Sequence, residues 1–199
     1  MLPINDSEIH EIVKKVLARV NEQAVPAAAI TKSVAAIELP KQKSEQKKVV
    51  AIGSDHGGYD LKENLKTYLK ELGFEMVDCG CPDKNAVDYP DFAYAVASMI
   101  AAGTAWRGVM IDGAGIGSCM VGNKVPGVRA ALCYDYATAS NSREHNDANM
   151  LTLGAGLIGI NLAKQIVKTW LETAYAGGRH QNRIDKLLEI ERKYLKTGS

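Results

Sequence analysis

The chain has 199 residues, of which 46% are hydrophobic and 24% charged, and its formal net charge is +1. This is the composition of a soluble globular protein that can bury a sizeable core. The small net charge argues against nucleic acid or an anionic membrane as a partner. No apolar run approaches the roughly eighteen residues that a membrane span needs, so we expect no membrane insertion.

The cysteines and the first residues of the chain bear on where the protein works. Cys79 and Cys81 are too close in sequence to bridge comfortably, and no CxxC pair is present to bind zinc. We therefore expect reduced thiols, no metal and no cofactor. Residues 1–6 lack the basic and apolar regions of a secretory signal. Together these features predict a cytoplasmic protein.

Residues 1–22 predict an amphipathic helix, and residues 23–47 have the composition of a linker. The apolar side chains of the helix recur at spacings of three and four and fall on one stripe. The stripe consists of Ile9, Ile12, Val13, Val16, Leu17 and Val20. A short helix on a tether cannot bury such a stripe alone, so it needs a partner. That partner is either its own domain or a second copy of the chain, or else another protein on which the helix docks.

Residues 48–199 predict one domain in which short apolar runs alternate with helical periodicity. Strands are expected at 49–52, 74–77, 109–111, 128–133 and 150–153, and helices at 61–72, 92–102, 135–144, 160–171 and 184–194. This alternation predicts a three-layer α/β fold, a doubly wound, Rossmann-like sheet of five parallel strands with helices on both faces. Ligands in such folds bind at the carboxyl ends of the strands.

Two polar clusters directly follow predicted strands. Asp55 and His56 follow the first strand, where Asp55 either serves a ligand or caps the next helix. The third strand runs into a glycine loop, residues 112–118, with glycines at every second position: Gly113, Gly115 and Gly117. Successive amides in such a loop converge on an anion, which predicts a cradle for a substrate oxyanion. A dinucleotide site is not predicted, because its third glycine comes one residue later and its loop usually follows the first strand.

Two more clusters carry histidines and arginines. His145 lies in the polar stretch 142–149, where it is poorly placed for a core and well placed for proton transfer. Arg179, His180 and Arg183 follow Gly177 and Gly178. Two guanidinium groups and an imidazole can bind a phosphate or a carboxylate. The alternative is that these residues form the solvent-exposed start of a helix and bind no ligand.

In their order along the chain, these motifs resemble the ribose-5-phosphate isomerase B family, which includes the galactose-6-phosphate isomerase subunits. The resemblance covers residues 49–195 and rests on the following segments: GSDHGG from Gly53, VDYP from Val87, the glycine loop, Asn123-Lys124 with GVRA from Gly127, REHNDAN from Arg143, and GGRHQNR from Gly177. It implies an aldose–ketose isomerase without metal or cofactor that works through an enediolate.

The resemblance also implies roles for individual residues. His145 would help to open the sugar ring, and the loop amides, including those of Gly113, Gly115, Gly117 and Ser118, would hold the enediolate oxygen. Sugar contacts would come from Asp55, His56, Tyr89 and Asn146. Phosphate would be bound by Arg179, His180 and Arg183, usually in the site of a partner subunit. A homodimer or a dimer of dimers is therefore implied.

Four positions lack residues that are common in that family. Asp112 stands where a catalytic cysteine is common, and Ser118 stands where a subset carries a catalytic glutamate. A carboxylate is a competent base for enolisation, so we hypothesise that Asp112 replaces the thiolate. Ala114 removes a hydroxyl group from the loop, and Gly156 stands where relatives often have a phosphate-binding arginine.

Three functions follow from these observations. The first is a pentose-phosphate isomerase that interconverts ribose 5-phosphate and ribulose 5-phosphate. The second is an isomerase of a different sugar or sugar phosphate, and the third is a catalytically silent sugar-phosphate-binding or structural protein. The N-terminal helix and linker resemble the encapsulation peptides that attach enzymes to bacterial microcompartment shells. Residues 5–20 are thus predicted to bind a shell protein and to place the enzyme inside a microcompartment.

Overall fold

The computed structural model of the protein describes residues 48–195. The predicted N-terminal helix and linker lie outside the described residues. The strands are β1 (Val49–Ser54), β2 (Glu75–Asp78), β3 (Arg107–Asp112), β4 (Ala130–Leu132) and β5 (Met150–Gly154). The helices are α2 (Tyr59–Glu71), α3 (Tyr89–Ala101), α4 (Ile116–Gly122), α5 (Tyr136–Glu144), α6 (Ile160–Glu172), the 3₁₀ helix η1 (Gly178–His180) and α7 (Gln181–Tyr194).

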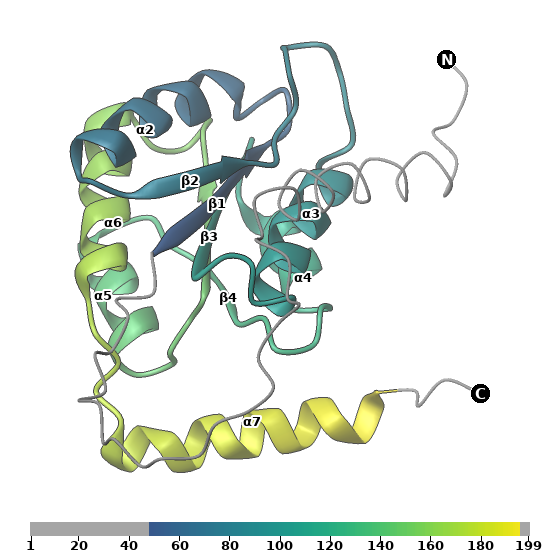
Figure 1. Cartoon of the computed structure of the whole chain (residues 1–199), viewed down its shortest axis with the longest axis vertical. Coiled ribbons are helices and arrows are strands. Elements are labelled where there is room, and N and C mark those ends of the chain that lie inside the picture. The colour runs from purple at the N-terminus through teal and green to yellow at the C-terminus, as the bar shows by residue number, and fades with distance from the viewer. Residues whose placement is uncertain (1–47, 196–199) are drawn as a thin grey trace, which may run out of the picture. The chain divides into compact units, whose positions relative to one another are not determined.

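The five strands are parallel and lie in the order β2-β1-β3-β5-β4. Helices α3 and α4 cover one face of the sheet, and α2, α5 and α6 cover the other (Figure 1). This confirms the predicted doubly wound fold of three layers. After β1 the chain continues to β2, which is the neighbour of β1 on one side, and then to β3, which is the neighbour of β1 on the other side. The strand order therefore reverses between β1 and β3, which is where such sheets bind ligands.

The main difference from the expected elements is helix α4, which the sequence did not predict. Its seven residues, Ile116–Gly122, include two glycines, so they show no periodic apolar stripe. Strand β4 is also shorter than the expected 128–133, and its three residues are only half-buried at the edge of the sheet. Short elements of this kind are set by their tertiary surroundings more than by local sequence.

The two faces of the sheet are covered differently. Large apolar side chains fill the space toward α2, α5 and α6, including the fully buried Leu65 and Trp170. Under α3 the sheet carries two glycines beside the buried Met110. A Cβ on Gly53 would lie 2.7 Å from Val96 Cγ2, and one on Gly108 would lie 2.6 Å from Val96 Cγ1. The glycines therefore let α3 lie close against β1 and β3.

Helix α7 runs along one side of the described domain and is mostly exposed (Figure 1). Its one buried residue is Ile184, whereas Leu187 is 43%, Ile190 57% and Tyr194 83% exposed. The Glu191 carboxylate accepts a hydrogen bond of 3.1 Å from the Gly127 amide. Within residues 48–195, the apolar residues of α7 thus remain largely uncovered.

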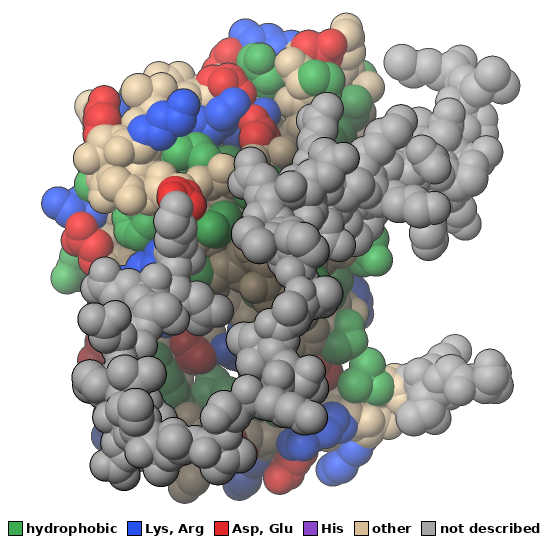
Figure 2. All heavy atoms as spheres, in the orientation of Figure 1, with side chains coloured by type: hydrophobic (Ala, Val, Ile, Leu, Met, Phe, Trp, Pro, Cys, Tyr) green, Lys and Arg blue, Asp and Glu red, His purple; other side chains and the backbone are tan. Residues whose placement is uncertain are grey.

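The surface of the described domain gives two further facts. Figure 2 shows acidic and basic side chains intermixed over α2 and β2, so this part of the surface has no single sign of charge. Among the described helices, none is long and apolar enough to cross a membrane.

Candidate active site

The carboxyl ends of β1 and β3 bring two predicted clusters together. The Asp55 amide donates to the Ile111 carbonyl at 3.2 Å, which ties the segment after β1 to the end of β3. A Cβ on Gly57 would lie 3.6 Å from the Gly113 nitrogen, so the two segments are in contact. Asp55, His56 and the glycine loop therefore share the carboxyl edge of the sheet, as the sequence predicts.

The glycine loop is folded around the carboxylate of its own first residue. Asp112 Oδ1 accepts the amides of Ala114, at 2.8 Å, and of Gly115, and its Oδ2 accepts the Ser118 amide, at 3.2 Å, and the Ser118 hydroxyl. Gly115 has φ +77°, a conformation that favours glycine. The Asp112 residue is only 5% exposed. Its carboxylate thus fills its acceptor positions with four donors from the loop.

This arrangement changes the expected anion cradle. The amides of Gly115 and Ser118, which we expected to face the substrate, donate to Asp112 instead. Within the described part of the chain, the amides of Gly113, Ile116 and Gly117 donate to no protein acceptor. These three amides are therefore the loop donors available to a substrate oxyanion.

Tyr89 and His56 border the glycine loop. A Cβ on Gly117 would lie 2.6 Å from the Tyr89 hydroxyl oxygen, so the tyrosine ring packs directly on this glycine. His56 Nδ1 lies 3.2 Å from both the amide nitrogen and the carbonyl oxygen of Val87, so it accepts from the amide in one tautomer and donates to the carbonyl in the other. Either contact ties the imidazole ring to the segment that precedes α3.

Asp55 is a buried carboxylate beside a second one. It is 7% exposed, and its Oδ1 accepts the Gly58 amide at 3.0 Å. Burial raises the pKa of Asp55, and the negative charge of Asp112 raises it further, while the Gly58 amide and the charge of His56 oppose these effects. Ionisation of Asp55 therefore lowers the stability of the folded chain, as is common for functional carboxylates.

The remaining predicted residues lie at the opposite edge of the sheet. His145 follows α5 and precedes β5, and its ring stacks on that of His180 with centroids 4.2 Å apart. Arg183 Nη1 lies 3.3 Å from His180 Nδ1, and Arg179 Nε lies 3.4 Å from His180 Nε2. Burial, followed by the charges of His145 and the two arginines, lowers the pKa of His180. Asn146, next to His145, is exposed.

The two groups of residues cannot meet within one chain. The Asn149 carbonyl, just before β5, accepts the Gly108 amide at the start of β3, whereas the glycine loop follows the end of β3. The six residues of β3 separate the two edges by roughly 17 Å at about 3.3 Å per residue. The expected ring-opening residue His145 thus lies with the expected phosphate-binding residues and not beside Asp112.

Asp147 fixes the turn that carries His145. It is the only non-glycine residue with positive φ, +45°, among residues 48–195. Its carboxylate bonds to Arg129 Nη2 at 2.8 Å and to Arg143 Nη1 at 2.9 Å. The ion pairs thereby hold a backbone conformation that most residues avoid. The sequence motif contained Asp147, but only the fold shows which arginines it meets.

Another residue without a signal in the sequence is Lys62. Helical periodicity places it on α2 beside apolar residues, yet it is 2% exposed and bonds to Asp78. Spacing along the chain does not reveal this pair, because the two residues belong to different elements.

Comparison with known proteins identifies the family. A family model described as ribose/galactose isomerase matches residues 50–187. The chain belongs to this family. It is 40% identical to ribose-5-phosphate isomerase B of Escherichia coli over 146 residues, which cover 73% of this chain and 98% of that protein. It is also 40% identical to D-erythrulose-4-phosphate isomerase of Pectobacterium atrosepticum over 139 residues, or 69% of this chain and 91% of that protein.

Solved structures agree with this assignment. The structure of Clostridium thermocellum ribose-5-phosphate isomerase B superposes with a TM-score of 0.73 and 48% identity, covering 74% of this chain and 99% of that one. The chain is therefore a sugar-phosphate aldose–ketose isomerase. Among the described residues, no group of three or more histidine, cysteine or acidic side chains is arranged to hold a metal ion.

We predict that Asp55→Asn stabilises this isomerase at neutral pH while weakening substrate binding. Because burial raises the pKa of Asp55 above its ordinary 3.8, the wild-type chain loses stability as the pH rises through that raised pKa. Asparagine keeps an oxygen for the Gly58 amide but carries no charge. Melting temperatures should be equal near about pH 4 and higher for the variant at about pH 7.5. A variant that is less stable than wild type at both pH values would contradict this account.

Proposed function

We propose that this isomerase interconverts ribose 5-phosphate and ribulose 5-phosphate through an enediolate. The observation that carries the proposal is the meeting of Asp55, Asp112 and the free loop amides at the switch point of the sheet. Enolisation needs a base and a site that stabilises negative charge on oxygen. The relatives named ribose-5-phosphate isomerase B in Escherichia coli and Clostridium thermocellum support this choice of sugar.

In the proposed mechanism Asp112 is the base. It removes the proton from C2 of the open-chain aldose, and the electron pair forms the C1–C2 double bond and leaves negative charge on O1. The free amides of Gly113 and Gly117 stabilise this charge. Asp112 then returns the proton to C1, while the proton of the O2 hydroxyl moves to O1. His56, Tyr89 and Asp55 hold the sugar.

The hydrogen bonds of Asp112 set a condition on this step. Four donors occupy its carboxylate, so one oxygen must be freed before it can take a proton from carbon. Three of the donors are amides fixed by the backbone. The fourth is the hydroxyl of Ser118, which can rotate away. We infer that substrate binding displaces this hydroxyl from Oδ2.

The proposed site is completed by a second copy of the chain. Because the two groups of residues lie at opposite edges of the sheet, a sugar phosphate held at the glycine loop can reach Arg179, His180 and Arg183 only in a partner. His145 would enter from that partner as well. The exposed Leu187, Ile190 and Tyr194 of α7 offer apolar surface for the association. A homodimer is the smallest such assembly, and a dimer of dimers also satisfies the condition.

One other function competes with the proposal. The identity to the Pectobacterium D-erythrulose-4-phosphate isomerase equals that to the Escherichia coli enzyme, so these two relatives alone do not select between their sugars. An isomerase of a different sugar phosphate is therefore the second candidate. Turnover of ribose 5-phosphate and of D-erythrulose 4-phosphate by the purified protein separates the two.

We predict that Asp112→Asn lowers kcat for ribose 5-phosphate at least about 100-fold, the usual contribution of a general base. Asp112→Cys, which restores the thiol usual in relatives, should keep measurable turnover. Melting temperatures verify that both variants are folded, and calorimetry with ribose 5-phosphate should show that the Asn variant still binds. An Asn variant with unchanged kcat would refute Asp112 as the base.

We predict that two inactive variants restore each other when they share a dimer. Asp112→Asn lacks the base and Arg179→Ala/Arg183→Ala lacks the phosphate site, so each homodimer is inactive. In a mixed dimer one of the two sites receives neither change. Co-expression of the two chains should therefore recover about a quarter of wild-type activity, since about half of random dimers are mixed. No recovery in dimers shown to be mixed would place the whole site in one chain.

We propose that residues 5–20 dock the enzyme on a microcompartment shell protein, on the strength of the apolar stripe and linker in the sequence. A chain lacking residues 1–22 should keep its kcat and its oligomeric state but lose co-assembly with shell protein, as measured by co-sedimentation. Leu17→Glu in the full chain is the matched control, because it spoils the stripe without shortening the chain. Co-assembly that persists after the deletion, or loss of activity with it, would contradict docking.

A further inference from the structure

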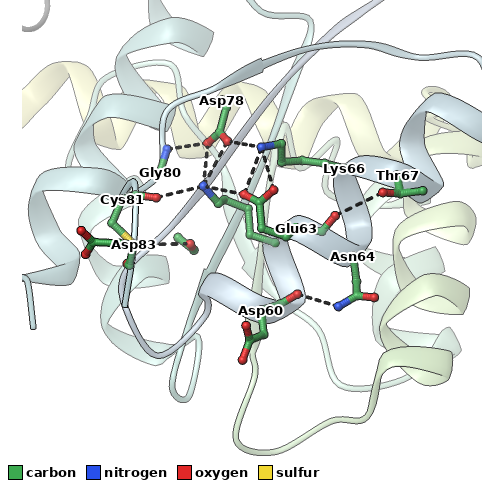
Figure 3. Close-up of polar contacts among 11 residues, drawn as sticks. Asp60, Glu63, Asn64, Lys66, Thr67, Asp78, Gly80, Cys81 and Asp83 are labelled. Carbon is green, nitrogen blue, oxygen red and sulfur yellow. Dashed lines mark hydrogen bonds and ion pairs between the residues drawn. The ribbon is translucent and has the colours of Figure 1, made fainter. Parts of the chain in front are cut away.

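Helix α2 contains a lysine that is almost completely buried. Lys62 is 2% exposed, although lysine is almost never fully buried unless it is paired. Its ammonium group donates to both Asp78 oxygens, at 3.1 and 3.0 Å, and to the Cys81 carbonyl at 3.0 Å. It also lies 3.2 Å from Glu63 Oε1. Figure 3 labels its partners Glu63 on α2, Asp78 at the end of β2 and Cys81 in the segment that follows β2.

Burying an ammonium group costs free energy, because the charged group loses its hydration. An apolar side chain of similar volume would fill the core without that cost. Its partners indicate what the charge achieves. Asp78 ends β2, and Cys81 lies three residues further on. The Cys81 amide donates to the Ser54 carbonyl at 2.9 Å, which joins this segment to the end of β1. Lys62 thus fixes the chain where it leaves β2 beside the active site.

Gly80 shows how closely the chain is fitted at this point. A Cβ on Gly80 would lie 2.7 Å from the Ser54 nitrogen and 3.0 Å from Lys62 Nζ. The Gly80 amide donates to Asp78 Oδ1 at 2.9 Å. The backbone at residue 80 is therefore held between the ammonium group and β1 with no room for a side chain.

The segment anchored in this way leads directly to residues that border the glycine loop. Residues 79–88, which we call the 79–88 loop, contain neither helix nor strand. Near its far end the Val87 amide meets His56 Nδ1 at 3.2 Å, and the next helix begins with Tyr89, which packs on Gly117. The middle of the loop has an exposed ion pair between Lys84 and Asp60, and such pairs contribute little.

We propose that Lys62 is a positioning residue that holds the 79–88 loop against β1 and thereby places His56 and Tyr89 for the sugar. The inference rests on the proposed function in that it takes these two residues as substrate contacts. Lys62 itself touches no substrate. Its buried charge supplies what an apolar side chain lacks, a donor directed at the Cys81 carbonyl.

Lys66 provides a matched control on the same helix. It bonds to Asp78 at 2.7 Å and to Glu63 at 3.0 Å, and it is 25% exposed (Figure 3). It shares the charge and the acidic partners of Lys62, but among its bonds in the described chain there is none to Cys81. After Lys62→Met, the Asp78 carboxylate still has Lys66 and the Gly80 amide, so the variant is not left with an unpaired buried carboxylate.

The test compares Lys62→Met with Lys66→Met in the full chain. For Lys62→Met we expect the KM for ribose 5-phosphate to rise about tenfold while kcat stays within about threefold, because the base is untouched. Trypsin should cut after the exposed Lys84 about tenfold faster, since local opening sets the rate of cleavage. Lys66→Met should change neither quantity. Gly80→Ala keeps the charge of Lys62, but its Cβ would meet both the Ser54 nitrogen and the Lys62 side chain. It should therefore displace the loop from both and reproduce both effects of Lys62→Met.

The outcomes separate the inference from the proposed function. If both methionine variants only lower the melting temperature by similar amounts, with KM and the cleavage after Lys84 unchanged, Lys62 is a structural ion and the inference is overturned. If Lys62→Met does not fold, Gly80→Ala decides by the same two measurements. If the wild-type protein does not turn over ribose 5-phosphate, the proposed function fails. The trypsin comparison then still decides whether Lys62 holds the loop.

Discussion

Strands that run parallel all end at the same edge of their sheet, and this constraint governs the proposed site. Asp55 and the glycine loop follow β1 and β3, so they meet at the carboxyl edge. The turn with His145 precedes β5, so it must lie at the amino edge, where it stacks on His180. A sheet cannot bring its two edges together. Any chemistry that uses both groups therefore requires two chains, as in the proposed homodimer.

At the carboxyl edge, the arrangement depends on one buried carboxylate. Asp112 collects three amides and one hydroxyl from the loop that follows it, which sets the path of the loop into α4. The same residue is the proposed base. Its two roles are compatible only if the Ser118 hydroxyl can leave, because the three amides are part of the loop structure. On the other side of the proposed site, Lys62 and the 79–88 loop determine the positions of His56 and Tyr89.

The sequence was sufficient for much of the fold, because the apolar runs near Val50, Val109 and Leu151 are short, buried and separated by helical periodicity. It was insufficient for α4, which has too few residues and too many glycines to show a period. The polar motifs suggested the residues of the proposed site, since they directly follow or precede strands. Their grouping was not apparent, because a motif does not show that Asp112 would occupy the loop amides. Nor does spacing show that Lys62 would meet Cys81, a contact made only when α2 folds onto β2.

The most direct test of the two-edge site is a crystal structure of the protein with ribulose 5-phosphate bound. We predict that C1 and C2 of the sugar lie against the glycine loop of one chain, near Asp112, Gly113 and Gly117. The phosphate should be bound by the partner subunit's Arg179 and the partner subunit's Arg183. A complex in which the sugar and its phosphate contact residues of a single chain would contradict the account.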